Sequence, residues 1–277
     1  MKKVILTLSI LTILVCSCKD EDVLNASEQT SLQASKDHLF SENIFNDINR
    51  VVEDGFNDNG LSKSSCANYK SLASDSSDAD TLIIDFGNVD CLDEYGKLRR
   101  GKIIVIYTAP YQDSLAQITT TFDHYYVNST NWIQGNRVLK NLGRNTDGYM
   151  VFDITIDANI TTEIGRIDWI ANRTRIWIDG RNTTQYPFDD IYKVVGTASG
   201  NGLNNRDFNV EITDSLEINL GCLKQTITYN KRCVIVSGKA KVTPDEYSER
   251  EIDYGIGGCN CDFSVVINGN NYLVVVP

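Results

Sequence analysis

The sequence predicts a mainly β protein: an antiparallel meander of about 14 short strands, arranged as a curled sheet or a sandwich and preceded by one amphipathic helix. Apolar and polar residues alternate strictly over residues 152–157, 208–213 and 216–220, as in half-buried strands. An apolar period of three to four residues occurs near the N-terminus, and no second long helical pattern suggests βαβ units. Four turn pairs lie at hairpin spacing: Asp147-Gly148, Asp179-Gly180, Asn201-Gly202 and Asn268-Gly269.

Residues 1–17 have the composition of a secretory signal peptide. Lys2 and Lys3 precede an uncharged, largely apolar stretch over residues 4–15, which is too short to span a bilayer but suits a signal peptide. The residues before Cys18 resemble a bacterial lipobox, which implies cleavage at that point and acylation of Cys18, with palmitate among the acyl chains. Two or more chains on one cysteine would anchor the protein stably. An ordinary cleaved signal peptide is the alternative.

Residues 18–35 form the lipidated cysteine and a polar, flexible tether. Lys19, Asp20, Glu21 and Asp22 resemble the Lys-plus-acidic signal that sends Bacteroidetes lipoproteins to the cell surface. This resemblance implies an outer-membrane protein, anchored by lipid, with its folded domain facing outward. The alternative is an inward-facing anchor followed by a solvated acidic linker.

The charge of the chain limits its partners. The whole chain has a formal net charge of −11, and without the two lysines of the signal peptide the mature chain would have 24 basic and 37 acidic residues, or −13. Such a surface disfavours nucleic acid and repels anionic lipid headgroups, which leaves the N-terminal lipid anchor as the membrane contact.

Residues 36–60 carry the helical period. Phe40, Ile44, Ile48, Val51 and Val52 form one apolar stripe, which we expect to pack on the sheet. Ser35 or Asp37 is the expected N-cap, and residues 58–60 are expected to end the helix. Residues 61–277 then form the β domain, in which the continuous apolar runs 103–106 and 273–276 suggest central strands covered on both faces.

An internal echo suggests a duplication. Residues 84–87 (Ile-Asp-Phe-Gly), followed by Cys91, match residues 252–255 (Ile-Asp-Tyr-Gly), followed by Cys259, with the same spacing. A glycine follows ten residues after each cysteine. We therefore expect residues 84–109 to repeat as residues 252–277, with convergent strand and turn patterns as the alternative.

Six cysteines follow Cys18, and an exported protein makes disulfides the first interpretation. The echo suggests that Cys66 pairs with Cys91 and that Cys233 pairs with Cys259, which leaves Cys222 for Cys261. The alternative, a metal site built from the last four cysteines, lacks a paired CxxC motif. We expect no metal and no cofactor.

Residues 80–276 resemble a set of uncharacterised Bacteroidetes surface lipoproteins. The resemblance implies a β-rich fold and an envelope location, but no activity, cofactor or catalytic residue. The shared segments are residues 84–91, 99–105, 125–128, 174–175, 177–180, 196–200, 252–255, Gly257 and Cys259.

The sequence contains no recognisable catalytic motif, and we predict no catalytic residue. His38 lies in the predicted helix, and His124 stands where similar sequences carry Asn; no Gly-x-Ser-x-Gly motif offers a nucleophile. A pair of carboxylates could still belong to a glycosidase. The acidic segment 75–80 could bind calcium but suits a solvated turn better, because it lacks the glycine and the glutamate of an EF-hand loop.

Trp169, Trp177, Arg173 and Arg175 belong to the richest aromatic and basic cluster of this acidic chain. On an exposed sheet face they would form a ligand-binding surface for an extracellular glycan or protein. Cross-strand packing, with the arginines paired to nearby acids, is the favoured alternative.

These features together predict a non-enzymatic surface lipoprotein with a role in binding, adhesion or envelope structure. The alternative is a periplasm-facing lipoprotein that carries a lipid or another apolar ligand on a curved sheet partly covered by the helix. A surface-exposed degradative enzyme with two close carboxylates is the third candidate.

Overall fold

The computed structural model describes residues 31–57, 66–72, 79–183, 186–224 and 233–275. It contains one long helix, α2 (Gln33–Asn57), and two short 3-10 helices, η1 (Pro187–Asp189) and η2 (Leu220–Lys224). The strands are β1 (Asn68–Leu72), β2 (Asp80–Asp85), β3 (Cys91–Leu92), β4 (Leu98–Tyr107), β5 (Gln117–Val127), β6 (Asn131–Arg144), β7 (Met150–Thr162), β8 (Gly165–Asp179), β9 (Ile191–Asn201), β10 (Asp207–Asn219), β11 (Ile235–Pro244), β12 (Arg250–Ile256), β13 (Asp262–Ile267) and β14 (Asn270–Val275).

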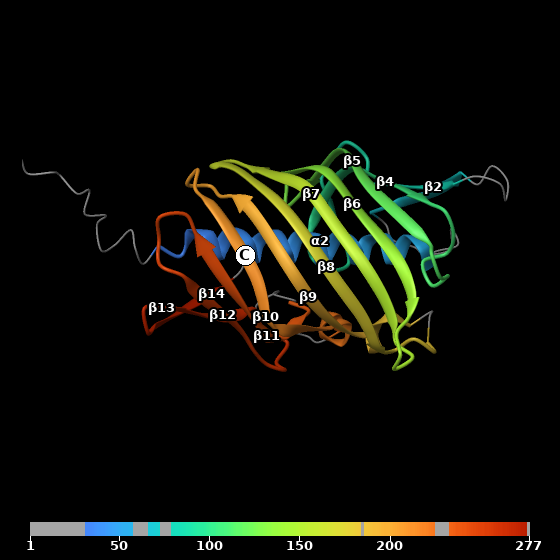
Figure 1. The fold of residues 1–277 in the computed structure, drawn as a ribbon. Helices are drawn as coiled ribbons and strands as arrows, with labels where there is room; N and C mark the ends of the chain where they lie inside the picture. The colour runs from blue at the N-terminus through green and yellow to red at the C-terminus, as the bar shows by residue number, and fades with distance from the viewer. Residues whose placement is uncertain (1–30, 58–65, 73–78, 184–185, 225–232, 276–277) are drawn as a thin grey trace, which may run out of the picture.

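All 14 strands belong to one antiparallel sheet, which confirms the predicted fold class. The strands follow one another in chain order from β1 to β14, and the short β3 pairs with β4 beside this path. The sheet curls around α2, so the curled-sheet form of the prediction is correct and the sandwich is not (Figure 1). All four predicted turn pairs lie where one strand ends and the chain leads to the next, with Asp179 and Asn201 as the last residues of β8 and β9.

Helix α2 fills the concave face of the sheet and forms the centre of the core (Figure 1). The predicted stripe is buried at Ile44, Ile48, Val51 and Val52, as expected for an amphipathic helix. Phe45 adds a stacked contact with Trp169 of β8 at a ring-centroid distance of 5.3 Å. Because the sheet surrounds the helix on several sides, polar helix residues are buried as well.

The helix begins earlier than predicted, at Gln33, so Ser35 and Asp37 lie within its first turns and neither is the N-cap. The backbone N–H of Gln33 donates to Ser31 Oγ instead, at 3.3 Å. Asp37 links the helix to the sheet: its carboxylate accepts hydrogen bonds from Gln33 Nε2 and from the backbone N–H of Leu203. The predicted end of the helix, at residues 58–60, lies outside the described residues.

Bulges bend the long strands so that the sheet can curl. In β4, the pairing with β5 shifts between Arg100 and Lys102, at Gly101. Gly101 has a φ of +84°, and a Cβ there would lie 1.9 Å from the carbonyl oxygen of His124. Only glycine allows this close approach of the two strands.

The two continuous apolar runs are not equivalent. In β4, Ile103 and Val105 are buried, but Ile106 is 45% exposed. The run in β14 lies at the edge of the sheet, where Leu273 is 70% exposed. The prediction of a central strand is therefore wrong for β14: the strand alternates between faces, and its outward side chains happen to be apolar.

The six cysteines form three disulfides, of which Cys66–Cys91 was predicted correctly. The other two are Cys222–Cys259 and Cys233–Cys261, so both remaining predicted pairs are wrong. Ladder pairing between β11 and β12 ends at Ser237 opposite Ile256. Continuing that register would place Cys233 opposite Asn260, midway between the two candidate partners, so hairpin register does not favour either one.

The two segments of the internal echo share a local turn. Asp85 Oδ1 accepts a hydrogen bond from the N–H of Gly87, and Asp253 Oδ1 accepts one from the N–H of Gly255. The segments then diverge, because the next shared glycine lies inside β4 in the first and in the β13–β14 turn in the second. The duplication remains a prediction.

Candidate functional site

The predicted ligand face, Trp169, Trp177, Arg173 and Arg175, points inward. These β8 side chains are between 1% and 4% exposed, so the prediction of an exposed binding surface is wrong for all four. The alternating pattern identified them as one face of a strand, but it could not reveal that this face meets the helix. The packing alternative is correct, although the arginines pair with helix residues rather than with the acids of β8.

Both arginines of this face bind acids of α2 inside the core. Arg173 Nη2 lies 2.8 Å from Glu42 Oε2, and Arg175 Nη2 lies 2.7 Å from Glu53 Oε1. Burial raises the pKa of Glu42, but the charge and hydrogen bond of Arg173, together with His38, outweigh burial, and the net direction is downward. The Arg175 guanidinium also lies over the Tyr192 ring, 3.9 Å from its centroid.

A third ion pair uses Asp47, which lies between Glu42 and Glu53 on the helix. Arg99 Nη2 is 2.8 Å from Asp47 Oδ2, and Arg99 Nε is 2.7 Å from Asp93 Oδ2. Burial opposes ionisation of Asp47, yet the charges of Arg99, Lys97 and Arg50 together outweigh it and hold the Asp47 pKa well below its usual range. Acids of α2 and arginines of the sheet thus match along the interface, which fixes the helix in one position.

The two histidines lie apart. His38 is fully buried, with Nε2 3.2 Å from the Tyr254 hydroxyl, and burial lowers its pKa to about 4, so it is neutral at pH 7. His124 is exposed, and its Nδ1 lies 2.7 Å from Asp123. No group of three or more potential metal ligands occurs within the described ranges, and the cysteines of the alternative metal site are in disulfides there.

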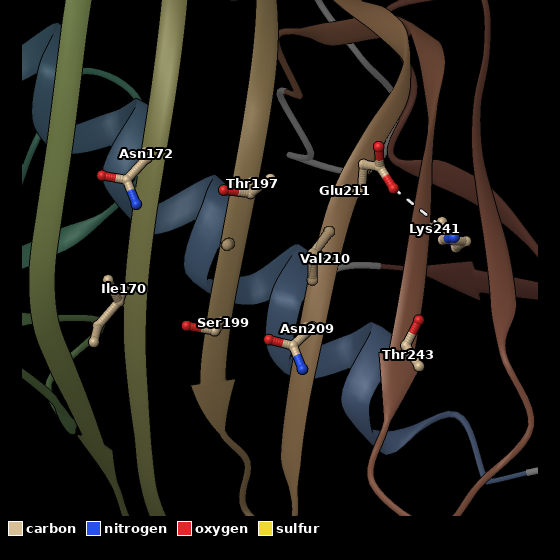
Figure 2. Close-up of a pocket in the computed structure, with 10 residues that line it drawn as sticks. Ile170, Asn172, Thr197, Ser199, Asn209, Val210, Glu211, Lys241 and Thr243 are labelled. Carbon is tan, nitrogen blue, oxygen red and sulfur yellow. Dashed lines mark ion pairs between the residues drawn. The ribbon is translucent and has the colours of Figure 1, made fainter.

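The outer face of the same strands carries a hollow of about 420 Å³ (Figure 2). It spans β8, β9, β10 and β11, on the side of the sheet opposite α2. We call it the outer hollow, and it is lined by Ile170, Asn172, Thr197, Ala198, Ser199, Asn209, Val210, Glu211, Lys241 and Thr243.

The segment Gly196-Thr197-Ala198-Ser199-Gly200 of β9 explains why the sheet is hollowed here. Gly196 has a φ of +135°, and a Cβ on it would lie 2.1 Å from the carbonyl oxygen of Asn172. A Cβ on Gly200 would lie 2.2 Å from the carbonyl oxygen of Asp168. The two glycines let β9 approach β8 closely. Between them, short side chains leave space above the strand.

The outer hollow offers mainly uncharged hydrogen-bonding groups. Asn172 and Asn209 provide amides, and Thr197, Ser199 and Thr243 provide hydroxyls. None of these five side chains hydrogen bonds to another residue that the structure describes. Ile170, which is 48% exposed, adds an apolar surface. The set can donate to and accept from a polar ligand while contacting its apolar parts.

One ion pair closes the β11 side of the hollow. Glu211 and Lys241 face each other across β10 and β11, with 3.8 Å between Oε2 and Nζ (Figure 2). Lys241 Nζ also lies 3.5 Å from Glu249. Glu211 is the one carboxylate among the described lining residues, and the nearby charge of Lys241 offsets part of its repulsion of an anionic ligand.

The remaining predicted site residues are not placed. Cys18, Lys19, Asp20, Glu21 and Asp22 lie outside the described residues, as does most of the acidic segment 75–80. No helix in the described part of the chain is both long and apolar enough to cross a membrane. Comparison with protein-family models, curated proteins and solved structures finds no match for this chain.

Proposed function

We propose that the chain is a lipid-anchored surface protein of the outer membrane, without enzymatic activity, that binds a neutral glycan in the outer hollow. The observation that carries this proposal is the position of α2. Because the helix occupies the concave face, the outer face is the side of the sheet left for a ligand (Figure 1). That face carries five side chains that can form hydrogen bonds around a shallow space and that have no hydrogen-bond partner in the part of the chain that the structure describes.

A neutral glycan suits this site for chemical reasons. Sugar hydroxyls both donate and accept hydrogen bonds, as do the amides and hydroxyls of the hollow. The sugar C–H faces would contact Ile170, in the way that binding sites combine apolar contact with a few placed polar groups. The outer hollow is open, and none of its described lining residues is aromatic. We therefore expect weak binding to each site.

A periplasm-facing lipoprotein that carries an apolar ligand is the second candidate function, and the structure disfavours it. An apolar molecule on the concave face would have to displace α2 and separate the pairs Glu42–Arg173, Glu53–Arg175 and Asp47–Arg99. Leaving one member of a buried pair without its partner costs about 3–5 kcal/mol. A hydrolase in the outer hollow would lack the second carboxylate that a glycosidase requires.

Binding is tested with the full chain against an array of neutral and acidic polysaccharides, followed by titration calorimetry on the ligands found. Ser199→Arg should block the space and abolish binding. The matched control is Asn136→Arg, which adds the same side chain to an exposed position on β6 outside the hollow. If the wild type binds no neutral glycan, or if Ser199→Arg binds as well as the control, the proposed ligand site is wrong.

The proposed location is tested separately by surface proteolysis of intact cells. The native chain is compared with a variant in which Lys19, Asp20, Glu21 and Asp22 are all alanine. Cleavage of the native chain alone supports surface display through this signal. If neither form is cleaved in intact cells while both are cleaved after lysis, the domain faces the periplasm and the carrier ranks first.

A further inference from the structure

β14 forms one edge of the sheet and has the features of an interaction surface. In the described part of the chain it pairs with β13 alone. Its six residues, Asn-Asn-Tyr-Leu-Val-Val, include no charged residue and no proline, and its register with β13 is unbroken from Asn270 to Val275. Natural proteins usually protect edge strands with lysine, proline or a bulge. β14 has none of these.

The opposite edge differs. β1 carries Lys70, an exposed residue of the kind that discourages strand addition. Pairing β1 of one copy with β14 of another would also be a head-to-tail contact, which repeats without closing. The contrast between the two edges therefore favours a contact that uses β14 on both sides.

The β13–β14 turn determines which backbone groups face outward. Asn268 and Gly269 form a two-residue turn, both with positive φ, between the paired residues Ile267 and Asn270. In such a hairpin the residues that flank the turn form a hydrogen-bonded pair, and bonded and non-bonded pairs then alternate. The free N–H and C=O groups at the edge consequently belong to Asn271, Leu273 and Val275.

The side chains of those same residues lie on the outer face. Leu273 is 70% exposed and Val275 is 43% exposed, whereas Val274, which points to the core, is 2% exposed. The edge thus presents an uncharged aliphatic strip together with unpaired backbone groups. On a chain of formal net charge −11, this strip is a place where two copies can meet without bringing like charges together.

We propose that β14 pairs with β14 of a second copy of this chain, antiparallel and about a two-fold axis at Leu273. Leu273 then faces Leu273 of the partner copy, and each Asn271 faces a Val275. The three facing pairs form about six main-chain hydrogen bonds, and the leucines bury each other. The contact is self-complementary, as a two-fold interface requires.

The contact is small. One six-residue strand from each copy falls at or below the low end of the ~1,200–2,000 Å² that specific stable interfaces bury, so we expect a dissociation constant in the micromolar range. The proposal does not rest on the glycan site or on surface export, because it uses only the geometry of the sheet edge.

Disulfide trapping in the purified full chain tests the register. Under mild oxidation, Leu273→Cys should form a covalent dimer, because each Leu273 faces its symmetry mate. Val275→Cys should remain monomeric, because it faces Asn271, and the double variant Asn271→Cys/Val275→Cys should again form the dimer. If Leu273→Cys does not crosslink, or if Val275→Cys crosslinks equally well, the proposed pairing is wrong.

Sedimentation of the purified full chain supplies a test without new cysteines. Leu273→Lys places like charges at the two-fold axis and should weaken association at least tenfold. Leu142→Lys is the matched control, because Leu142 is a 55% exposed leucine on β6, away from the sheet edge. The proposal is wrong if the wild type stays monomeric up to about 100 μM, a concentration far above the expected micromolar dissociation constant. Binding of an unrelated extended peptide would not rescue it.

Discussion

Removing Arg173 from the pair Glu42–Arg173 should cost about 3 kcal/mol of stability at pH 7, and Arg173→Met tests this value. The substitution leaves the Glu42 carboxyl buried beside His38, which is neutral because its pKa is lowered to about 4. Glu42 then takes up a proton on folding. The ordinary glutamate pKa is 4.5, which lies about 2.5 units below pH 7. Protonating the carboxyl at pH 7 costs about 1.36 kcal/mol for each of these units, or roughly 3 kcal/mol in total.

The pH dependence identifies the cause. In the variant, the folded-state pKa of Glu42 lies above its unfolded value, so the cost is absent below about pH 4 and grows as the pH rises. We expect Arg173→Met to lose about 3 kcal/mol at pH 7 but only about 1 kcal/mol at pH 5. Glu42→Gln/Arg173→Met should recover most of the loss at pH 7, because glutamine has no proton to take up.

Urea unfolding followed by tryptophan fluorescence measures these differences, because Trp169 and Trp177 are buried reporters. Lys193→Met is the control, since the pair Lys193–Glu217 spans 2.8 Å but lies on the surface, and its loss should cost less than about 1 kcal/mol. A loss for Arg173→Met that is the same at pH 5 and pH 7, or a double variant no more stable than Arg173→Met, would refute the reasoning.

Two further predictions concern β8 and β9. Burial raises the pKa of Asp190 to about 7, although Tyr192 and Trp177 donate hydrogen bonds to its carboxylate. Because the pKa is higher in the folded state than in the unfolded state, protonation of Asp190 stabilises the fold fully below about pH 4. This stabilisation is lost as the pH rises through 7. The wild type should be less stable at pH 8 than at pH 5, and Asp190→Asn should reduce this difference by about 1–2 kcal/mol, a value discounted for partial solvent access. If the difference is the same in the variant, the prediction is wrong. Gly196→Ala should lower the free energy of unfolding in urea by about 2–4 kcal/mol, and the control Gly148→Ala should lower it by about 1 kcal/mol. Both glycines have positive φ, but only at Gly196 would a Cβ meet backbone atoms. Equal losses would contradict the close approach of the strands.

Residue periodicity was sufficient to predict the strands and the helix, but not which face of each strand is buried. Residues 169–177 alternate between two faces in the sequence, and both faces carry plausible binding groups. Arg173 and Arg175 belong to the richest aromatic and basic cluster of the chain, which suggests a ligand face, although packing with nearby acids is the favoured interpretation. Their partners, Glu42 and Glu53, lie more than 100 residues away, and no local pattern links them.

The candidate site had a sequence signal that was not interpreted. Gly196-Thr197-Ala198-Ser199-Gly200 is a run of small residues inside a strand, and glycine in a strand often marks a close backbone approach. Short side chains between two such glycines leave a depression on the surface of the sheet. The disulfide errors have a similar origin, because the cysteines lie beyond the end of β12 pairing, where strand register no longer determines their positions.

The position of α2 also constrains how a lipid anchor would act on the domain. The helix begins at Gln33, within the predicted tether, and is fixed to the sheet by Glu42, Asp47 and Glu53. A force transmitted through an anchored N-terminus would therefore act on the centre of the fold. A helix that served only to connect the tether to the domain could lie outside the sheet. Here the segment next to the predicted anchor is the centre of the fold, and losing the helix would expose the buried arginines of β4 and β8. The anchor-proximal segment and the sheet should therefore unfold together rather than in separate steps.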